Sequence, residues 1–194
     1  DNERANLYRK MNNIPYSWGT AVNVQMMAFG NMNQNSGTGV GFTRQPTDGQ
    51  NHIFAEYLIE AQGEDVVAGI RTPLHIDALK EQQPKIYNQL VTSAKKLEKH
   101  YKDMQDFEFT VEDGKLYFLQ TRNGKRTIFS WIRSQVEMVE EGLIDKETAV
   151  SRVPANEFSK LFAPILDNKI IRDLNITPDT KGLNASPGGA CGQI

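Results

Sequence analysis

Two segments of alternating polarity constrain the fold of this chain more than any other part of its sequence. Polar and apolar side chains alternate through residues 106–111 and again through residues 115–122. A period of two is typical of strands that bury one face. Glu112, Asp113 and Gly114, which separate the two segments, have the composition of a tight turn. The pattern predicts a β-hairpin.

The length of the turn decides which side chains the two strands present together. Asp106 and Glu108 are two positions apart and share a face, as do Gln120 and Arg122 on the partner strand. With a two-residue turn, the acids and Gln120 lie on opposite faces. With a three-residue loop, Asp106 lies opposite Gln120 and all four side chains gather. The residues leave both registers open.

The gathered face would suit a magnesium polyphosphate. Magnesium prefers hard oxygen ligands and shares its coordination with substrate phosphates, and Asp106, Glu108 and Gln120 all carry such oxygens. The guanidinium of Arg122 offers a planar fork to phosphate oxygens. A solvated hairpin face with a cross-strand Glu–Arg pair is the plainer interpretation of the same residues.

The rest of the chain predicts alternating strands and helices. The periodicity indicates strands at 16–29, 39–43 and 53–59, helices at 84–101 and 128–142, and another helix start at Asp145. A glycine-rich loop at 30–38 lies between the first two strands, and its end at 35–39 would let backbone amides approach an anion. That loop lacks the Gly-Lys-Ser/Thr ending of a P-loop, and Glu64 is either a ligand or an ordinary loop acid.

Composition excludes several classes of protein. Lysine and arginine number 22 against 24 acidic residues, so we expect no nucleic-acid partner held by bulk charge. A single cysteine excludes an intrachain disulfide scaffold. The apolar runs are far shorter than the roughly 20 residues of a membrane-spanning helix. We therefore expect a cytoplasmic protein with no membrane partner, while an organellar location of the parent protein stays open.

Four segments resemble the pyruvate, phosphate dikinase family: GTAVNVQMMAFGN, SGTGVGFTRQP, EYLIEAQGEDVVAGIRTP and LEKHYKDMQDFEFTVEDGKLYFLQTRNGKRT. The resemblance implies an α/β (α+β) fold, the C-terminal subdomain of an ATP-grasp domain, with a mainly antiparallel sheet flanked by helices. It places that subdomain at 1–127, a helical connecting region at 128–180, and the truncated start of a swivelling phosphohistidine domain at 181–194.

The resemblance also implies roles for individual residues, with ATP as substrate and Mg²⁺ as cofactor. Three residues would hold the metal and its phosphates: Asp106, Glu108 and Gln120. Arg122 would bind the polyphosphate and act in catalysis. Further nucleotide contacts would come from Glu64 at the ribose or adenine, Met26 beside the adenine, and Ser36, Gly37, Thr38 and Gly39 over the phosphates.

In that family ATP, phosphate and pyruvate are interconverted with AMP, pyrophosphate and phosphoenolpyruvate. We therefore expect ATP and AMP as ligands, an N-terminal ATP-grasp subdomain and a phosphohistidine domain as missing partners within the same protein, and a homodimeric full-length enzyme. The chain alone would be an inactive piece. The alternatives are a phosphoenolpyruvate synthase-like dikinase and a non-catalytic ATP-binding or interaction domain.

Overall fold

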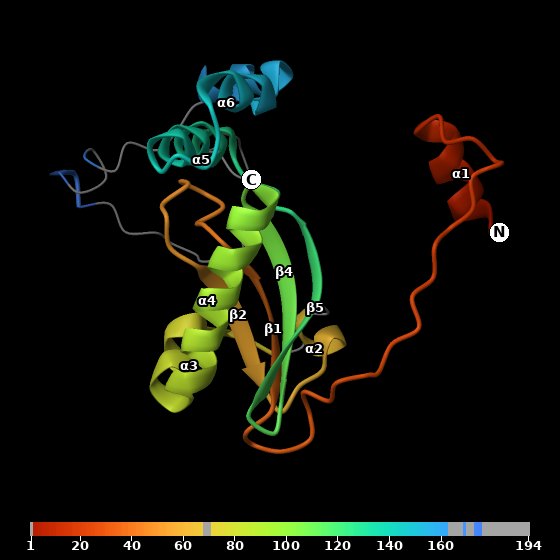
Figure 1. Cartoon of the computed structure of the whole chain (residues 1–194), viewed down its shortest axis with the longest axis vertical. Helices are drawn as coiled ribbons and strands as arrows, with labels where there is room; N and C mark the ends of the chain where they lie inside the picture. The colour runs from red at the N-terminus through yellow and green to blue at the C-terminus, as the bar shows by residue number, and fades with distance from the viewer. Residues whose placement is uncertain (1, 68–70, 163–168, 170–172, 176–194) are drawn as a thin grey trace.

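The computed structural model describes residues 2–67, 71–162, 169 and 173–175. Its centre is a five-stranded sheet in the order β3-β2-β1-β4-β5, with every neighbouring pair antiparallel (Figure 1). The strands are β1 (Gly37–Phe42), β2 (Phe54–Ile59), β3 (Leu74–His75), β4 (Gln105–Glu112) and β5 (Lys115–Asn123). The expected α+β class with an antiparallel sheet is confirmed.

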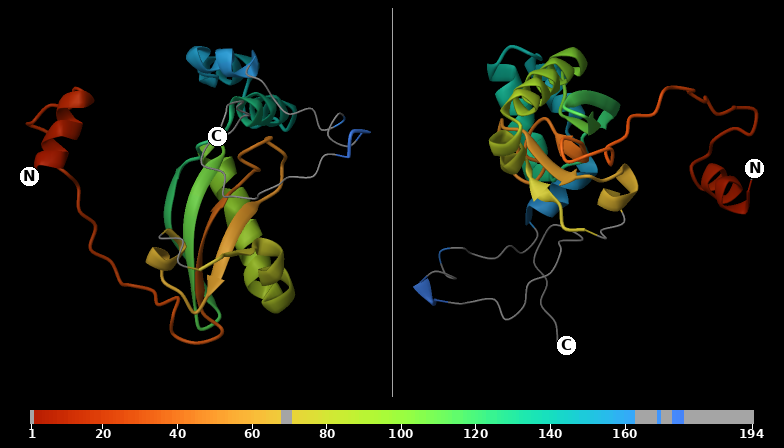
Figure 2. Two further views of the ribbon diagram at one scale, coloured as in Figure 1. Left: turned by 180° about the vertical axis from the view of Figure 1, so that it is seen from behind. Right: turned by 90° about the horizontal axis from the view of Figure 1, so that it is seen from below.

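Helices α3 (Ile76–Gln82) and α4 (Pro84–Tyr101) cover one face of this sheet (Figures 1 and 2). Beyond one end of the strands lie α5 (Ile128–Glu140) and α6 (Lys146–Arg152), followed by the 3₁₀ helix η1 (Ala155–Phe162). The two remaining helices are α1 (Glu3–Met11) and the short α2 (Gly63–Val67). In the described ranges, none of the helices combines the length and apolarity that crossing a bilayer requires.

The long helix α4 has the bounds that its sequence predicts. Pro84 occupies the first helical turn, where a missing backbone N–H costs nothing. Ile86, Leu90 and Ala94 follow at intervals of four and are buried against the sheet. The helix ends where Lys102 adopts a left-handed conformation, with φ of 53°.

The hydrophobic core lies between α3, α4 and one face of the sheet. Alternate residues of the strands enter it, among them Tyr57 from β2 and Phe107 and Phe109 from β4. Tyr57 and Phe109 stack with ring centroids 6.0 Å apart across the intervening strand β1. Because α3 and α4 cover this face, the charged residues of the strands lie on the other one.

The expected loop at 30–38 is too long, because β1 begins at Gly37 in the middle of the sheet. A Cβ on Gly39 would lie 2.4 Å from the Glu56 carbonyl oxygen and 2.5 Å from Cζ of Phe109. A Cβ on Gly37 would lie 2.3 Å from the hydroxyl oxygen of Tyr57. The glycines therefore make room for aromatic rings from the two neighbouring strands.

The predicted strand at 16–29 is wrong. Those residues form no strand, and Val22, Val24 and Met26 are exposed to 81%, 97% and 94%. They follow α1 in an extended arm that leads away from the sheet (Figures 1 and 2). An apolar run becomes a stable strand only when a neighbour pairs its backbone, and none of the described strands lies beside it.

A buried arginine fastens α5 to the sheet and α4. Arg44, which follows β1, is fully buried and donates two hydrogen bonds to Glu98 of α4, at 3.0 and 2.9 Å. Its other bonds go to Glu137 at 3.1 Å and Glu141 at 2.7 Å. Burial lowers the pKa of Arg44, but its bonds to Glu98 and Glu141 outweigh burial and raise that pKa above its ordinary value. Residues 128–141 therefore pack on the sheet subdomain.

The helical part begins as the sequence predicts. Thr127 caps α5 by accepting a hydrogen bond from the Ser130 amide, and Asp145 caps α6 by accepting one from Thr148. The hydrogen bond from the Thr148 amide holds the pKa of Asp145 below its ordinary value. The proposed domain boundaries stay predictions, and the expected phosphohistidine-domain start at 181–194 lies outside the described residues.

Candidate functional site

The hairpin that carries the four candidate site residues, Asp106, Glu108, Gln120 and Arg122, closes with a two-residue turn. Glu112 pairs with Lys115, and the two residues between them have positive φ, 46° at Asp113 and 73° at Gly114. This is the type I′ geometry that matches the twist of a hairpin. Without any further irregularity, such a turn would separate the acids of β4 from the polar residues of β5.

A β-bulge at Leu119 corrects the register. Phe109 pairs with Phe118, but Glu108 pairs with Gln120, so that Leu119 has no partner on β4. Farther along, Asp106 pairs with Arg122. Directly opposed residues of antiparallel strands project from the same face. The four side chains therefore share one face. The structure combines a two-residue turn with a bulge, whereas both registers expected from the sequence lacked a bulge.

The guanidinium of Arg122 lies between the two carboxylates. Its Nη2 atom is 2.6 Å from Oε1 of Glu108, and its Nε atom is 3.6 Å from Oδ2 of Asp106. The side chain of Arg122 is 51% exposed. Ion pairs in such surroundings contribute about 1 kcal/mol or less to stability. The cluster therefore adds little to stability and is open to a ligand from solvent.

The face that carries the cluster extends across the sheet. Phe42 lies opposite Asp106 and also opposite Phe54 on β2, and the two rings are 6.5 Å apart. In the adjacent row, Val40 lies opposite Glu108 on one side and Glu56 on the other. The sequence interpretation missed Glu56, although alternation in strand 53–59 was the signal that could have placed it on this face.

The donor atoms of the cluster fit a magnesium ion that has few protein ligands. Within the described ranges no group of three or more His, Cys, Asp and Glu residues could hold a metal ion. The protein thus offers two carboxylates, of Asp106 and Glu108, and the amide oxygen of Gln120 from one face. Such a set leaves most of an octahedral shell to phosphate oxygens and water, as is common for Mg²⁺ bound with a nucleotide.

Ser36, directly before β1, and Thr38, in β1, support the hairpin. The Ser36 hydroxyl is buried, accepts a hydrogen bond from the Asp113 amide at 2.9 Å and donates one to Asn33 Oδ1 at 3.0 Å. The Thr38 hydroxyl donates to the Phe109 carbonyl oxygen at 3.1 Å. These polar groups have partners within the fold, and the phosphate contacts expected of residues 36–39 stay a prediction.

The other predicted nucleotide contacts lie apart from the cluster. Glu64 is exposed in the first turn of α2, a short helix where the sequence predicted a loop. Met26 lies on the exposed arm. Neither residue has a hydrogen bond or ion pair with the four hairpin residues in the part of the chain that the structure describes. Their roles at the adenine or ribose also stay predictions.

Comparison with known proteins places the chain in a family. The family model described as "Pyruvate phosphate dikinase, AMP/ATP-binding domain" matches residues 1–93 and 76–142. The chain is 52% identical to pyruvate, phosphate dikinase of Clostridium symbiosum over 194 residues, which are 100% of the chain and 22% of that relative. It is 48% identical to the chloroplastic enzyme of Flaveria pringlei, of which it covers 20%.

A third relative, pyruvate, phosphate dikinase of Rhizobium meliloti (strain 1021), is 47% identical over 205 aligned residues, and 22% of its length is covered. The chain thus spans about a fifth of the length of the curated relatives it matches. The family match includes the whole sheet, the acid–arginine hairpin and α5. On this match, the chain belongs to the family of the pyruvate phosphate dikinase AMP/ATP-binding domain.

Proposed function

We propose that the chain is the ATP-binding part of a dikinase that interconverts ATP, phosphate and pyruvate with AMP, pyrophosphate and phosphoenolpyruvate. The observation that carries this proposal is the convergence of two carboxylates, an amide and a guanidinium on one open face of the sheet. Membership of the AMP/ATP-binding domain family supports it. The names of the relatives favour pyruvate, phosphate dikinase over a phosphoenolpyruvate synthase-like enzyme.

In this proposal Asp106, Glu108 and Gln120 hold Mg²⁺ together with the nucleotide phosphates. When bound, the metal would neutralise phosphate charge and fix the orientation of the polyphosphate. Arg122 now offsets the charge of Asp106 and Glu108. When the nucleotide is bound, its planar guanidinium donates to phosphate oxygens and balances the charge that develops during phosphoryl transfer.

The finer assignments belong to the same proposal. Glu64 would contact the ribose or adenine, Met26 would border the adenine, and residues 36–39 would lie over the phosphates. The greater length of the relatives supports further parts of the same protein, including an N-terminal ATP-grasp subdomain and a phosphohistidine domain. We propose a homodimeric, cytoplasmic parent enzyme; an organellar location is the alternative, because one relative is named chloroplastic.

Substitution in the full-length protein tests the proposal. Glu108→Gln replaces a charged oxygen ligand of Mg²⁺ by a neutral one, and Arg122→Gln removes a charge-assisted hydrogen bond to phosphate; we take about 1.5–3 kcal/mol, the value of such a hydrogen bond, as the scale of each loss. We expect each to weaken Mg·ATP binding, measured by titration calorimetry, by about 10- to 150-fold. Glu140→Gln, at an exposed position of α5, is the matched control and should bind normally. Unchanged binding in both hairpin variants would contradict the proposal.

Activity separates the catalytic proposal from a non-catalytic ATP-binding domain. In the full-length protein, Arg122→Gln should lower phosphoenolpyruvate formation even at saturating Mg·ATP, because Arg122 is assigned to the transition state as well as to binding. The chain alone should bind nucleotide weakly and form no phosphoenolpyruvate. Turnover of ATP and pyruvate by the chain alone would refute its assignment as one part of a larger enzyme.

A further inference from the structure

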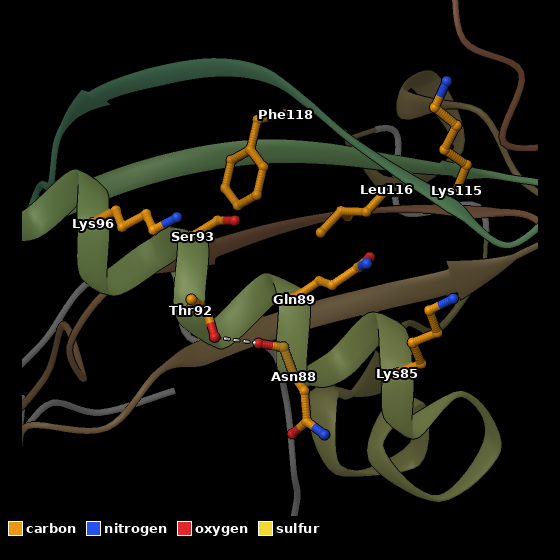
Figure 3. A pocket seen from close by; sticks show the side chains of 9 residues that line it. All are labelled: Lys85, Asn88, Gln89, Thr92, Ser93, Lys96, Lys115, Leu116 and Phe118. Atoms are coloured by element: carbon orange, nitrogen blue, oxygen red, sulfur yellow. Dashed lines mark hydrogen bonds between the residues drawn. The ribbon is translucent and has the colours of Figure 1, made fainter.

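A groove lies between α4 and β5, on the face of the sheet opposite the acid–arginine hairpin cluster. Its volume is about 940 Å³. Leu116 and Phe118 of β5 form its apolar side, and Phe118 packs on Phe107 of the core with ring centroids 5.3 Å apart. The opposite wall is a stripe of polar side chains along α4, including Gln89 and Ser93 (Figure 3).

The charge of the groove has one sign. Lys85 and Lys96, near the two ends of the α4 stripe, both line it, and no acidic residue among those the structure describes does (Figure 3). Neither lysine forms an ion pair within the ranges that the structure describes. A third lysine, Lys115, also lines the groove, and its ammonium group lies over the ring of Tyr117. Two cations thus flank an apolar centre without a carboxylate to balance them.

The groove also runs beside an open strand edge. β5 is the last strand of the sheet, and no other described strand pairs with its outer side. An unpaired edge offers alternating N–H and C=O groups that an extended peptide can bind. A second copy of the chain on this edge would bring its own lysines against Lys85 and Lys96, which like-charge repulsion disfavours. The unpaired edge of β5 and the positive charge of the two lysines together favour an acidic, extended peptide as the ligand.

We propose that this groove binds an extended acidic segment of another polypeptide, which adds to β5 as a sixth strand. Lys85 and Lys96 are eleven positions apart, which corresponds to about 16 Å along α4. Residues i and i+4 of a strand lie on one face about 13 Å apart, within reach of two lysine side chains. The segment therefore carries acids at i and i+4 and an apolar residue at i+2, which lies on Leu116 and Phe118.

A peptide with this pattern tests the proposal on the full-length protein. The probe is a dye-labelled, acetylated and amidated Thr-Glu-Thr-Val-Thr-Glu-Thr peptide, and its binding is followed by fluorescence anisotropy. The Lys85→Ala/Lys96→Ala double variant should bind it at least tenfold more weakly. Lys95→Ala/Lys99→Ala, which removes two exposed charges outside the groove from the same helix, should change binding less than twofold. Bound peptide should also slow amide hydrogen exchange in β5.

Three results would overturn the proposal. Equal weakening in the two double variants would mean that the peptide senses only the bulk charge of α4. Unchanged exchange in β5, together with lysine-dependent binding of inorganic tripolyphosphate, would mean a small-anion site in place of an added strand. Normal peptide binding by Lys85→Ala/Lys96→Ala, with new self-association of that variant, would mean that the lysines only protect the edge from aggregation.

Discussion

Replacing Arg44 by methionine should destabilise the protein far more than replacing an exposed arginine that shares one of its partners. Arg44 is fully buried and is the main partner of Glu98, whose side chain is only 9% exposed. Removing it leaves a buried carboxylate whose remaining hydrogen-bond donor among the described residues is the Thr43 hydroxyl, at 2.8 Å. Breaking a buried ion pair from one side costs about 3–5 kcal/mol. For a domain of this size the melting temperature should fall by about 6–20 °C.

The matched control is Arg133→Met. Arg133 also pairs with Glu137, at 2.7 Å, but it is 48% exposed, so its loss should cost no more than about 0.5 kcal/mol. In the double variant Arg44→Met/Glu98→Leu the buried carboxylate is removed as well, so about 1–3 kcal/mol should be recovered relative to Arg44→Met. Urea unfolding measures all three. Equal effects of Arg44→Met and Arg133→Met, or no recovery in the double variant, would refute the reasoning.

Three further predictions concern the sheet. Deleting Leu119 removes the bulge but keeps Gln120 opposite Glu108, so Mg·ATP binding by the full-length protein should persist; a loss measured by calorimetry would contradict the register. Gly39→Ala should destabilise by about 1–3 kcal/mol in urea unfolding, because its Cβ would lie 2.4 Å from a backbone oxygen; an unchanged midpoint would contradict this packing. Burial raises the pKa of Tyr57 to about 12, and its hydroxyl has no partner among the described residues, so Tyr57→Phe should not destabilise at neutral pH. Unfolded tyrosine ionises first, so wild-type stability should fall as the pH rises from about 10 to 12, and that Tyr57-dependent fall should disappear in Tyr57→Phe.

Local sequence signals were sufficient to predict the positions of the helices. Pro84 near the start of α4, apolar residues at intervals of three and four, and Asp145 before α6 fix elements whose hydrogen bonds lie within one segment. The bounds of α4 could therefore be predicted to the residue, 84–101. The membership of Asp106 and Glu108 in a hairpin was predictable for the same reason, since a turn and its flanking alternation are also local.

The register of the hairpin could not be predicted from local signals. The turn alone would have placed Leu119, and not Gln120, opposite Glu108. The bulge depends on what each face contacts: Phe118 packs on Phe107 in the core, while Gln120 and Arg122 project to the open face. The core and the open face exist only in the folded sheet. The sequence of β5 alone therefore does not show that a bulge is needed.

Glycines and apolar runs gave wrong predictions where tertiary contacts decide whether a segment forms a strand. Gly37 and Gly39 suggested a loop, but their lack of a side chain serves the rings of Tyr57 and Phe109 in the neighbouring strands. The run at 16–29 suggested a buried strand, but its strand propensity has no effect without a paired backbone beside it.

Paramagnetic relaxation by Mn²⁺·ATP tests the central claim most directly, because manganese replaces magnesium at oxygen ligands and broadens nearby NMR signals. In the full-length protein, the Gln120 side-chain amide and the Arg122 guanidinium should broaden first, at Mn²⁺·ATP concentrations that leave the signals of α6 sharp. Glu108→Gln should abolish the broadening at low Mn²⁺·ATP concentration. Broadening elsewhere, with Gln120 and Arg122 unaffected, would contradict the assignment of this sheet face to the metal-bound nucleotide.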